Sequence, residues 1–169
     1  MPARRHRPMK PPLDTRSNDP ARVLVPNREH ESRIHLDATL DIAEMLYGFP
    51  TPAYPHFRTF LNVPEVQQRV FTNFGRELTP DIVVVEWPER TLKIVGEVAT
   101  PARLTMDEAL DRWLPESRLE DVAFYLYVPA GYVQHSRRLL KEAGIKRKDL
   151  GLRSWRRFAL AGRPEIATY

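Results

Sequence analysis

The spacing of hydrophobic residues along the chain alternates between a helical period and the pattern of strands. In residues 29–47 the hydrophobic positions form one broad helical face, and a glycine follows where a C-terminal cap belongs. Thr105, with Glu108 three residues later, forms a capping box, so a second helix is expected from Thr105 to the residue before Pro115. A third helix is expected over residues 133–143.

Runs of β-branched and aromatic residues predict the strands. Five are expected: residues 68–74, 81–87, 91–98, 121–128 and 152–158. The first three are joined by short links, which favours an antiparallel meander. Residues 49–64 contain four prolines, so this segment is expected to be a loop without regular structure. Its aromatic side chains either cover an edge of the core or form a surface on which bases stack.

The predicted order is α-β-β-β-α-β-α-β. A meander followed by β-α-β units indicates an α/β protein with a mixed sheet and helices on both faces.

The first part of the chain has a different composition. Residues 1–27 are basic and rich in proline, lack hydrophobic periodicity and are expected to form a disordered arm. The cations of this arm either contact nucleic-acid phosphates or remain solvated. Residues 28–169 are expected to form a single domain.

The composition excludes several kinds of chemistry. The 169 residues include no cysteine, which removes disulfides, thiolate metal sites and cysteine nucleophiles. The five histidines lack metal-ligand spacing, there is no glycine-rich phosphate loop, and no serine lies in a nucleophile elbow.

The sequence also lacks membrane signals. No apolar run approaches the roughly 18 residues that span a bilayer, and no apolar stretch follows the basic start as in a signal peptide. We therefore expect a soluble, cytoplasmic protein with no membrane partner.

The formal net charge of +4 conceals an uneven distribution. Residues 1–35 hold 8 basic and 4 acidic residues, residues 36–136 hold 8 and 15, and residues 137–169 hold 10 and 3. An acidic middle therefore lies between two basic ends, and basic ends of this kind suit a polyanionic partner.

Two acidic residues lie at adjoining ends of a predicted hairpin. Asp81 begins one strand and Glu97 lies near the end of the next, so antiparallel pairing makes them neighbours. Divalent cations such as Mg²⁺ and Mn²⁺ prefer carboxylate and carbonyl oxygens, and the carbonyl of Val98 is expected close by. The pattern predicts a metal site that activates water for phosphodiester hydrolysis. Taken singly, each carboxylate also suits an ordinary turn or strand end.

This array resembles a known family. A helix ending in Gly48-Phe49, a Pro-Asp pair that ends at Asp81, and Glu97-Val98 in the next strand are similar to the PD-(D/E)xK nuclease superfamily, and more narrowly to archaeal Holliday-junction resolvases. The resemblance implies a restriction-endonuclease-like fold, with Asp81 and Glu97 as catalytic metal ligands.

The resemblance implies two further positions. The superfamily often adds an acidic residue from the first helix, for which Asp37 is favoured here over Glu29, Glu31 and Glu44. The motif lysine should stand two residues after Glu97, where this chain has Ala99. Nearby cations that can reach the site instead are Arg103 and Arg112.

The C-terminal third is strongly basic. Its expected nucleic-acid contacts are Arg137, Arg138, Lys141, Lys146, Arg147, Lys148, Arg153, Arg156 and Arg157. A solvated basic face is the alternative. Trp155, among these cations, either stacks on a base or points into the core.

The function expected from these features is a Mg²⁺- or Mn²⁺-dependent endonuclease that acts on DNA. The loss of the motif lysine motivates an alternative, a catalytically inactive nuclease-fold subunit that acts in DNA binding or complex assembly. A third interpretation is a protein-interaction module whose basic ends meet acidic partners. A homodimer or larger complex is compatible with the first two.

Overall fold

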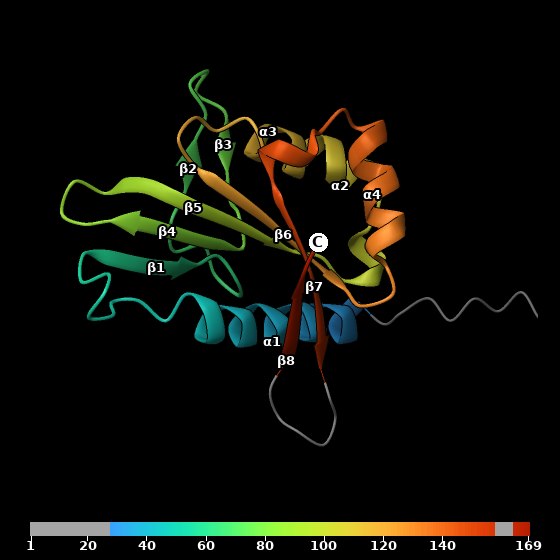
Figure 1. Ribbon diagram of the computed structural model, residues 1–169, viewed down its shortest axis with the longest axis horizontal. Coiled ribbons are helices and arrows are strands. Elements are labelled where there is room, and N and C mark those ends of the chain that lie inside the picture. The colour runs from blue at the N-terminus through green and yellow to red at the C-terminus, as the bar shows by residue number, and fades with distance from the viewer. Residues whose placement is uncertain (1–27, 158–163) are drawn as a thin grey trace, which may run out of the picture.

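A mixed sheet with helices on both faces forms the centre of the structure (Figure 1). The computed structural model describes residues 28–157 and 164–169. Within these residues the sheet has six strands, which are, in order across it, β1 (Phe57–Leu61), β4 (Ile82–Glu86), β5 (Thr91–Val98), β6 (Ala123–Pro129), β7 (Gly151–Arg157) and β8 (Pro164–Thr168). β6 runs parallel to both β5 and β7, and the other neighbours pair antiparallel. The predicted α/β class and mixed sheet are confirmed.

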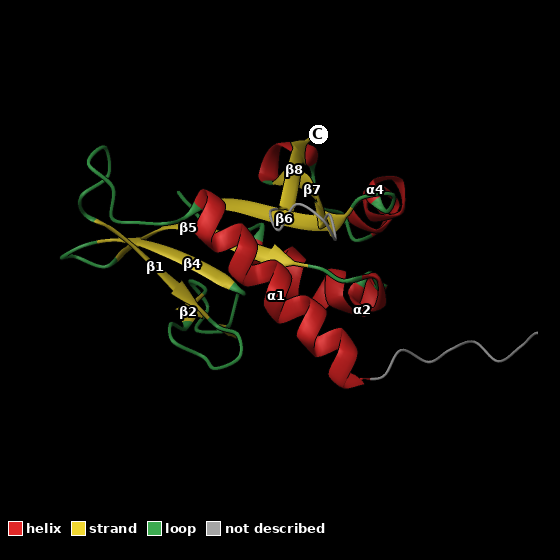
Figure 2. Cartoon of the chain, turned by 90° about the horizontal axis from the view of Figure 1, so that it is seen from below, coloured by secondary structure: helices red, strands yellow, loops and turns green. Residues whose placement is uncertain are grey.

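The first helix crosses one face of the sheet. α1 (Arg28–Leu46) runs diagonally beneath the strands, as Figure 2 shows. Its buried residues include Ala38 and Ile42, four positions apart on one side of the helix, and they pack with Ile82 and Val84 of β4. The apolar face that predicted this helix is thus the face that packs against the sheet.

The other helices cover the opposite face. α4 (Val133–Glu142) buries Val133, Leu139 and Leu140 against a core that includes Leu126 of β6. The predicted third helix is confirmed.

The second predicted helix has an unexpected internal structure. It consists of α2 (Met106–Glu108), a π-helical turn (Ala109–Trp113) and α3 (Leu114–Glu116). The predicted N-cap is confirmed, because Thr105 Oγ1 accepts the Glu108 N–H at 3.2 Å, while the carboxylate of Glu108 pairs with Arg103 and Arg112. The predicted end before Pro115 is wrong. Pro115 lies in the last turn, α3, directly after the π-helical turn, and has no N–H to donate back along the helix. The carbonyl of Asp111, four residues earlier, accepts a hydrogen bond from Arg76 Nη2 at 2.7 Å.

The segment expected to be a loop contains a strand. β1 lies in residues 49–64, where four prolines led us to exclude regular structure. The prolines all lie outside residues 57–61, so this stretch keeps its N–H donors and pairs with β4 at the edge of the sheet.

The predicted meander also needs correction. Of the strand predicted over residues 68–74, only β2 (Val70–Phe71) forms, and it pairs with β3 (Glu77–Leu78) in a separate two-stranded hairpin. The meander in the sheet is therefore β1-β4-β5. The sequence prediction also missed β8, an edge strand that begins with a proline.

Some predictions concern residues outside the described part of the chain. These are the arm at residues 1–27 and the end of the last predicted strand at Phe158. Among the described residues, no helix has the length and apolar character needed to cross a membrane.

Candidate functional site

The hairpin of β4 and β5 brings two carboxylates together. Ile82 pairs with Gly96, which places Asp81 opposite Glu97 as hairpin geometry predicted. Both side chains are buried, with only 2% of each residue exposed. Two carboxylates at this depth require compensation by hydrogen bonds or opposite charge.

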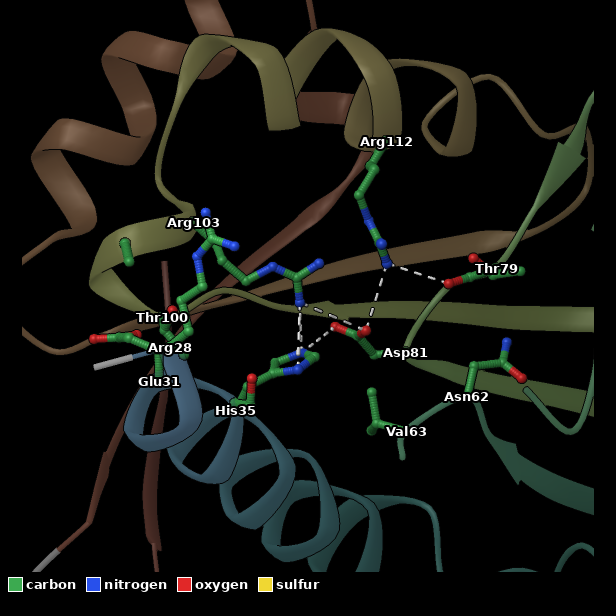
Figure 3. A pocket seen from close by; sticks show the side chains of 12 residues that line it. Arg28, Glu31, His35, Asn62, Val63, Thr79, Asp81, Thr100, Arg103 and Arg112 are labelled. Carbon is green, nitrogen blue, oxygen red and sulfur yellow. Dashed lines mark hydrogen bonds and ion pairs between the residues drawn. The ribbon is translucent and has the colours of Figure 1, made fainter. Parts of the chain in front are cut away.

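Arg112, on the π-helical turn, supplies that charge. Its Nη2 lies 2.7 Å from Glu97 Oε1 and its Nε lies 3.2 Å from Glu97 Oε2, so the guanidinium binds this carboxylate with two hydrogen bonds. The same Nη2 lies 3.4 Å from Asp81 Oδ1 and 3.2 Å from the carbonyl oxygen of Thr79 (Figure 3). One guanidinium therefore stands between the two carboxylates.

The other oxygen of Asp81 is held from two sides. Oδ2 accepts the backbone N–H of Val98 at 2.8 Å and lies 2.9 Å from Nε2 of His35, which reaches it from α1 (Figure 3). Nη1 of Arg103 lies 2.8 Å from the same histidine nitrogen and 3.9 Å from Asp81 Oδ1. A single ring nitrogen cannot donate to the carboxylate and accept from the guanidinium at once, so the tautomer of His35 selects between these bonds.

A third buried carboxyl group lies behind Glu97. Glu116, at the end of α3, is also only 2% exposed, and its carboxyl group is hydrogen-bonded to that of Glu97. Two carboxyl groups form such a bond only when one carries a proton. Within the described part of the chain, the second oxygen of Glu116, Oε2, has no hydrogen-bond partner.

Burial and charge shift the pKa values of these groups apart. Burial, and then the charge of Asp81, raises the pKa of Glu97 to about 7, although Arg112 acts to lower it. Burial, and then the charge of Glu97, raises the pKa of Glu116 well above its ordinary value. Burial also acts on Asp81, but the hydrogen bond and charge of His35, followed by Arg112 and Arg103, outweigh it and lower the pKa of Asp81. Asp81 is therefore the carboxyl group of the cluster that loses its proton most readily.

A cavity of about 580 Å³ opens beside Asp81, at the end of the sheet where β4 begins and β5 ends. Its charged lining residues are Arg28, Glu31, His35, Asp81, Arg103 and Arg112, and Asn62, Thr79 and Thr100 are among the neutral ones. The hydroxyl of Thr100 is buried and has no hydrogen-bond partner.

The helical contribution to the site differs from the prediction. The side chain of α1 that touches Asp81 belongs to His35, whereas Asp37, two positions away and half-buried, does not line the cavity. Glu31, weighed as an alternative to Asp37, does line it. His35 was not predicted from the sequence, because no second histidine lies at ligand spacing from it. Glu116 was not predicted, because the helix was expected to end before it.

Ala99, which stands where the motif lysine was expected, is a core residue. Ala99 is buried with the residues beneath α4, and its carbonyl accepts the indole N–H of Trp155 at 3.3 Å. A cation nevertheless reaches the acidic pair, because Arg112 and Arg103 extend to it from the segment that follows β5. Both arginines were identified from the sequence as able to do so.

As arranged, these side chains do not fit a divalent cation. Both oxygens of Glu97 accept from Arg112, and Oδ2 of Asp81 already has two nitrogen neighbours. Val98 approaches Asp81 with its N–H, not with the carbonyl that was expected as a ligand. In the described residues, no group of three His, Cys, Asp or Glu side chains is placed to hold a metal ion. Oxygen ligands would come from Asp81, Glu97 and Glu116 only after the guanidinium moved.

The basic C-terminal residues lie in three elements. α4 carries Arg137, Arg138 and Lys141, and the turn after it carries Lys146, Arg147 and Lys148; all six are exposed. β7 carries Arg153, Arg156 and Arg157, of which Arg153 is half-buried with its guanidinium 4.8 Å from the ring centre of Tyr125. Trp155 is buried and points into the core instead of towards a ligand.

Comparison of the chain with protein-family models, with curated proteins and with solved structures finds no match.

Proposed function

We propose that this chain is a nucleic-acid-binding protein with a restriction-endonuclease-like core that does not hydrolyse its ligand. The observation that carries this proposal is the guanidinium of Arg112 between Asp81 and Glu97. In a nuclease that resembles the PD-(D/E)xK pattern, a divalent cation would bind between these two carboxylates.

An internal arginine compensates the acidic pair without bringing in a Lewis acid. Its charge is delocalised over a planar group, and its N–H donors fix its orientation, whereas a hydrated metal ion offers a reactive water. The two hydrogen bonds to Glu97 use the lone pairs that a metal would need. The centre therefore stabilises the end of the β4–β5 hairpin and holds the cavity open, and it supplies no activated nucleophile.

The exposed cations of α4 and the turn after it give the chain its means of binding phosphates. Residues 137–148 hold six cations and one carboxylate, Glu142. None of the six forms an ion pair with a described carboxylate. Six phosphate contacts would lower the affinity by about 10³-fold between 50 and 200 mM salt, through release of counterions.

The test is DNA binding followed by fluorescence anisotropy over this salt range, in EDTA and in Mg²⁺. We expect no gain of affinity in Mg²⁺, a steep decrease with salt, and no cleavage of supercoiled, linear or branched DNA. Replacing Arg138 and Lys148 by alanine should reduce the slope of log K against log salt by about 2. The exposed control Arg118→Ala, on the segment after α3, should leave the slope unchanged. Affinity that is independent of salt in the native chain would contradict the proposal.

A second candidate function is hydrolysis of DNA by a Mg²⁺- or Mn²⁺-dependent endonuclease. Asp81, Glu97 and Glu116 are all buried, Oδ1 of Asp81 lies 3.4 Å from Arg112 Nη2, and Oε2 of Glu116 has no hydrogen-bond partner among the described residues. If metal binding displaced Arg112 towards the cavity, the arginine would take the place of the motif lysine. Cleavage by the native chain that is lost in Asp81→Ala would establish this function and refute the first.

A further inference from the structure

A second cavity, of about 640 Å³, shares no lining residue with the cavity beside Asp81. In register, Gly151 at the start of β7 lies level with Tyr125 of β6 and Gly96 of β5, so this cavity begins two strands away from the hairpin that holds Asp81. The cavity is formed where α4 ends and β7 begins. Its lining residues are Arg137, Leu140, Lys141, Gly144, Ile145, Lys146, Arg147, Leu150, Leu152 and Tyr169.

The lining combines an apolar wall with an aromatic side chain. Leu140, Ile145 and Leu152 are buried members of the core and form the apolar part. Tyr169 is fixed beside them, because its N–H donates to the carbonyl of Leu152 at 3.0 Å and its hydroxyl accepts from Ser154 Oγ at 3.2 Å. This surface suits a flat apolar group, which would remove it from water.

Four cations surround the same cavity. Lys141, Lys146 and Arg147 are exposed, and Arg137 lies with its guanidinium 5.9 Å from the ring centre of Tyr169. None of the four pairs with a carboxylate in the described parts of the chain, and no acidic side chain lines the cavity. The cavity therefore carries an uncompensated positive charge.

The end of α4 does not oppose an anion here. Gly144 adopts a left-handed φ of 75°, and the N–H groups of Gly144 and Ile145 return to the carbonyls of Lys141 and Leu140. This is the hydrogen-bond pattern of a Schellman cap, which satisfies the last carbonyls of the helix. It also turns Ile145 back into the wall of the cavity.

We propose that this cavity binds a nucleoside phosphate, with the base against the apolar wall and Tyr169 and the phosphate among the four cations. A simple anion would leave the apolar wall in water, and an apolar ligand would leave the cations without a partner. The volume lies within the range of about 300–1,000 Å³ that holds small organic ligands. The ligand is either a free nucleotide or the terminal nucleotide of a single strand, and the second case deepens the proposed function, on which it rests.

Calorimetric titration of the full chain with AMP, adenosine, inorganic phosphate and a 5′-phosphorylated single-stranded oligonucleotide tests this proposal. AMP should bind at least tenfold more tightly than adenosine or phosphate. Tighter binding of the phosphorylated oligonucleotide than of its unphosphorylated form identifies a strand end as the ligand, and tighter binding of AMP than of the oligonucleotide identifies a free nucleotide.

The variants Lys141→Ala with Arg147→Ala, and Tyr169→Ala, should each weaken AMP binding at least tenfold. Arg138→Ala, an exposed cation on α4 that does not line the cavity, is the matched control and should bind AMP normally. Asp81→Asn should also bind AMP normally, because Asp81 does not line this cavity. A failed test of the acidic cluster would therefore leave the proposed nucleotide site unaffected.

Three results would overturn the inference: AMP that binds no better than phosphate, cavity variants that behave like Arg138→Ala, or an acidic peptide that binds more tightly than any nucleotide. If the first of these results is found and long DNA still binds, the proposed function stands and this site is refuted.

Discussion

At the scale of single residues, Arg112 is the side chain that compensates the acidic cluster of Asp81, Glu97 and Glu116 in place of a metal ion. It contacts Asp81 and Glu97 together, and it does so from a π-helical turn, a rare element that often marks functional positions. Burial acts to lower its pKa, but the charge of Glu97 and the hydrogen bond to it outweigh that effect and raise it, so Arg112 stays charged.

Replacing Arg112 by alanine should destabilise the protein strongly. Removing one member of a buried ion pair costs roughly 3–5 kcal/mol, because the remaining charges lose their compensation. The free energy of unfolding in urea at pH 7 measures the effect. Arg118→Ala, an exposed arginine six residues further on, should change it by less than about 0.5 kcal/mol. Equal stability of the two variants would show that Arg112 does not neutralise the cluster.

Glu116 should make stability depend on pH. Its raised pKa means that the folded state keeps a proton that the unfolded chain releases above about pH 4.5, so stability falls as pH rises through this window. Glutamine cannot ionise and still donates to Glu97. Glu116→Gln should therefore be more stable than the native chain at pH 8, and this difference should shrink at pH 5.

Urea unfolding at the two pH values measures this difference, with the exposed Glu120→Gln as control. A native chain and a Glu116→Gln variant with parallel pH profiles would contradict the shared proton between Glu97 and Glu116.

The residues of the site were predictable from the sequence where their contacts depend only on the pairing of two consecutive strands. Asp81 and Glu97 were found because two strands joined by a short turn pair antiparallel, which brings the start of one beside the end of the other. His35 and Glu116 were missed because their contacts depend on how α1 and α3 dock on the sheet. His35 lies 46 positions from Asp81 in sequence, and no periodicity encodes that separation.

At the scale of elements, α1, β4, β5, β6, β7 and α4 follow the hydrophobic pattern, because each buries a continuous stripe or run. β1 and β8 do not, since an edge strand needs only one paired side and tolerates prolines at its ends. The π-helical turn was also invisible to sequence reasoning. A capping box predicts where a helix begins and not how it is wound.

The pairing of β6 with β7 depends on a glycine. Gly151 pairs with Tyr125, and a Cβ at Gly151 would lie 2.4 Å from Cδ1 of that ring. Gly151→Ala should lower the free energy of unfolding by about 1–3 kcal/mol, as overpacking does. The same substitution in a Tyr125→Ala background should cost much less, because the ring is gone. Equal costs in the two backgrounds would show that the ring is not the obstacle.

At the scale of the whole molecule, the acidic middle and the basic third of the sequence form two separate clusters on one sheet, which line different cavities. The carboxylates of the middle segment meet at the ends of β4 and β5, where two arginines and a histidine compensate them. The cations after residue 136 remain exposed on α4 and the turn beyond it. The charge asymmetry was readable from composition, but the internal compensation of the acidic cluster was not, because it depends on two arginine side chains that fold back onto it.

The central claim is that Arg112 stands in the place of a metal ion, and calorimetric titration with Mn²⁺ tests it most directly. The native chain should give no binding heat, and its DNA affinity should not be higher in Mn²⁺ than in EDTA. Arg112→Ala, if it stays folded at low temperature, should gain a Mn²⁺ site that Asp81→Asn removes; if it does not fold, the native titration alone decides. Stoichiometric Mn²⁺ binding by the native chain that is lost in Asp81→Asn, accompanied by DNA cleavage, would contradict the account.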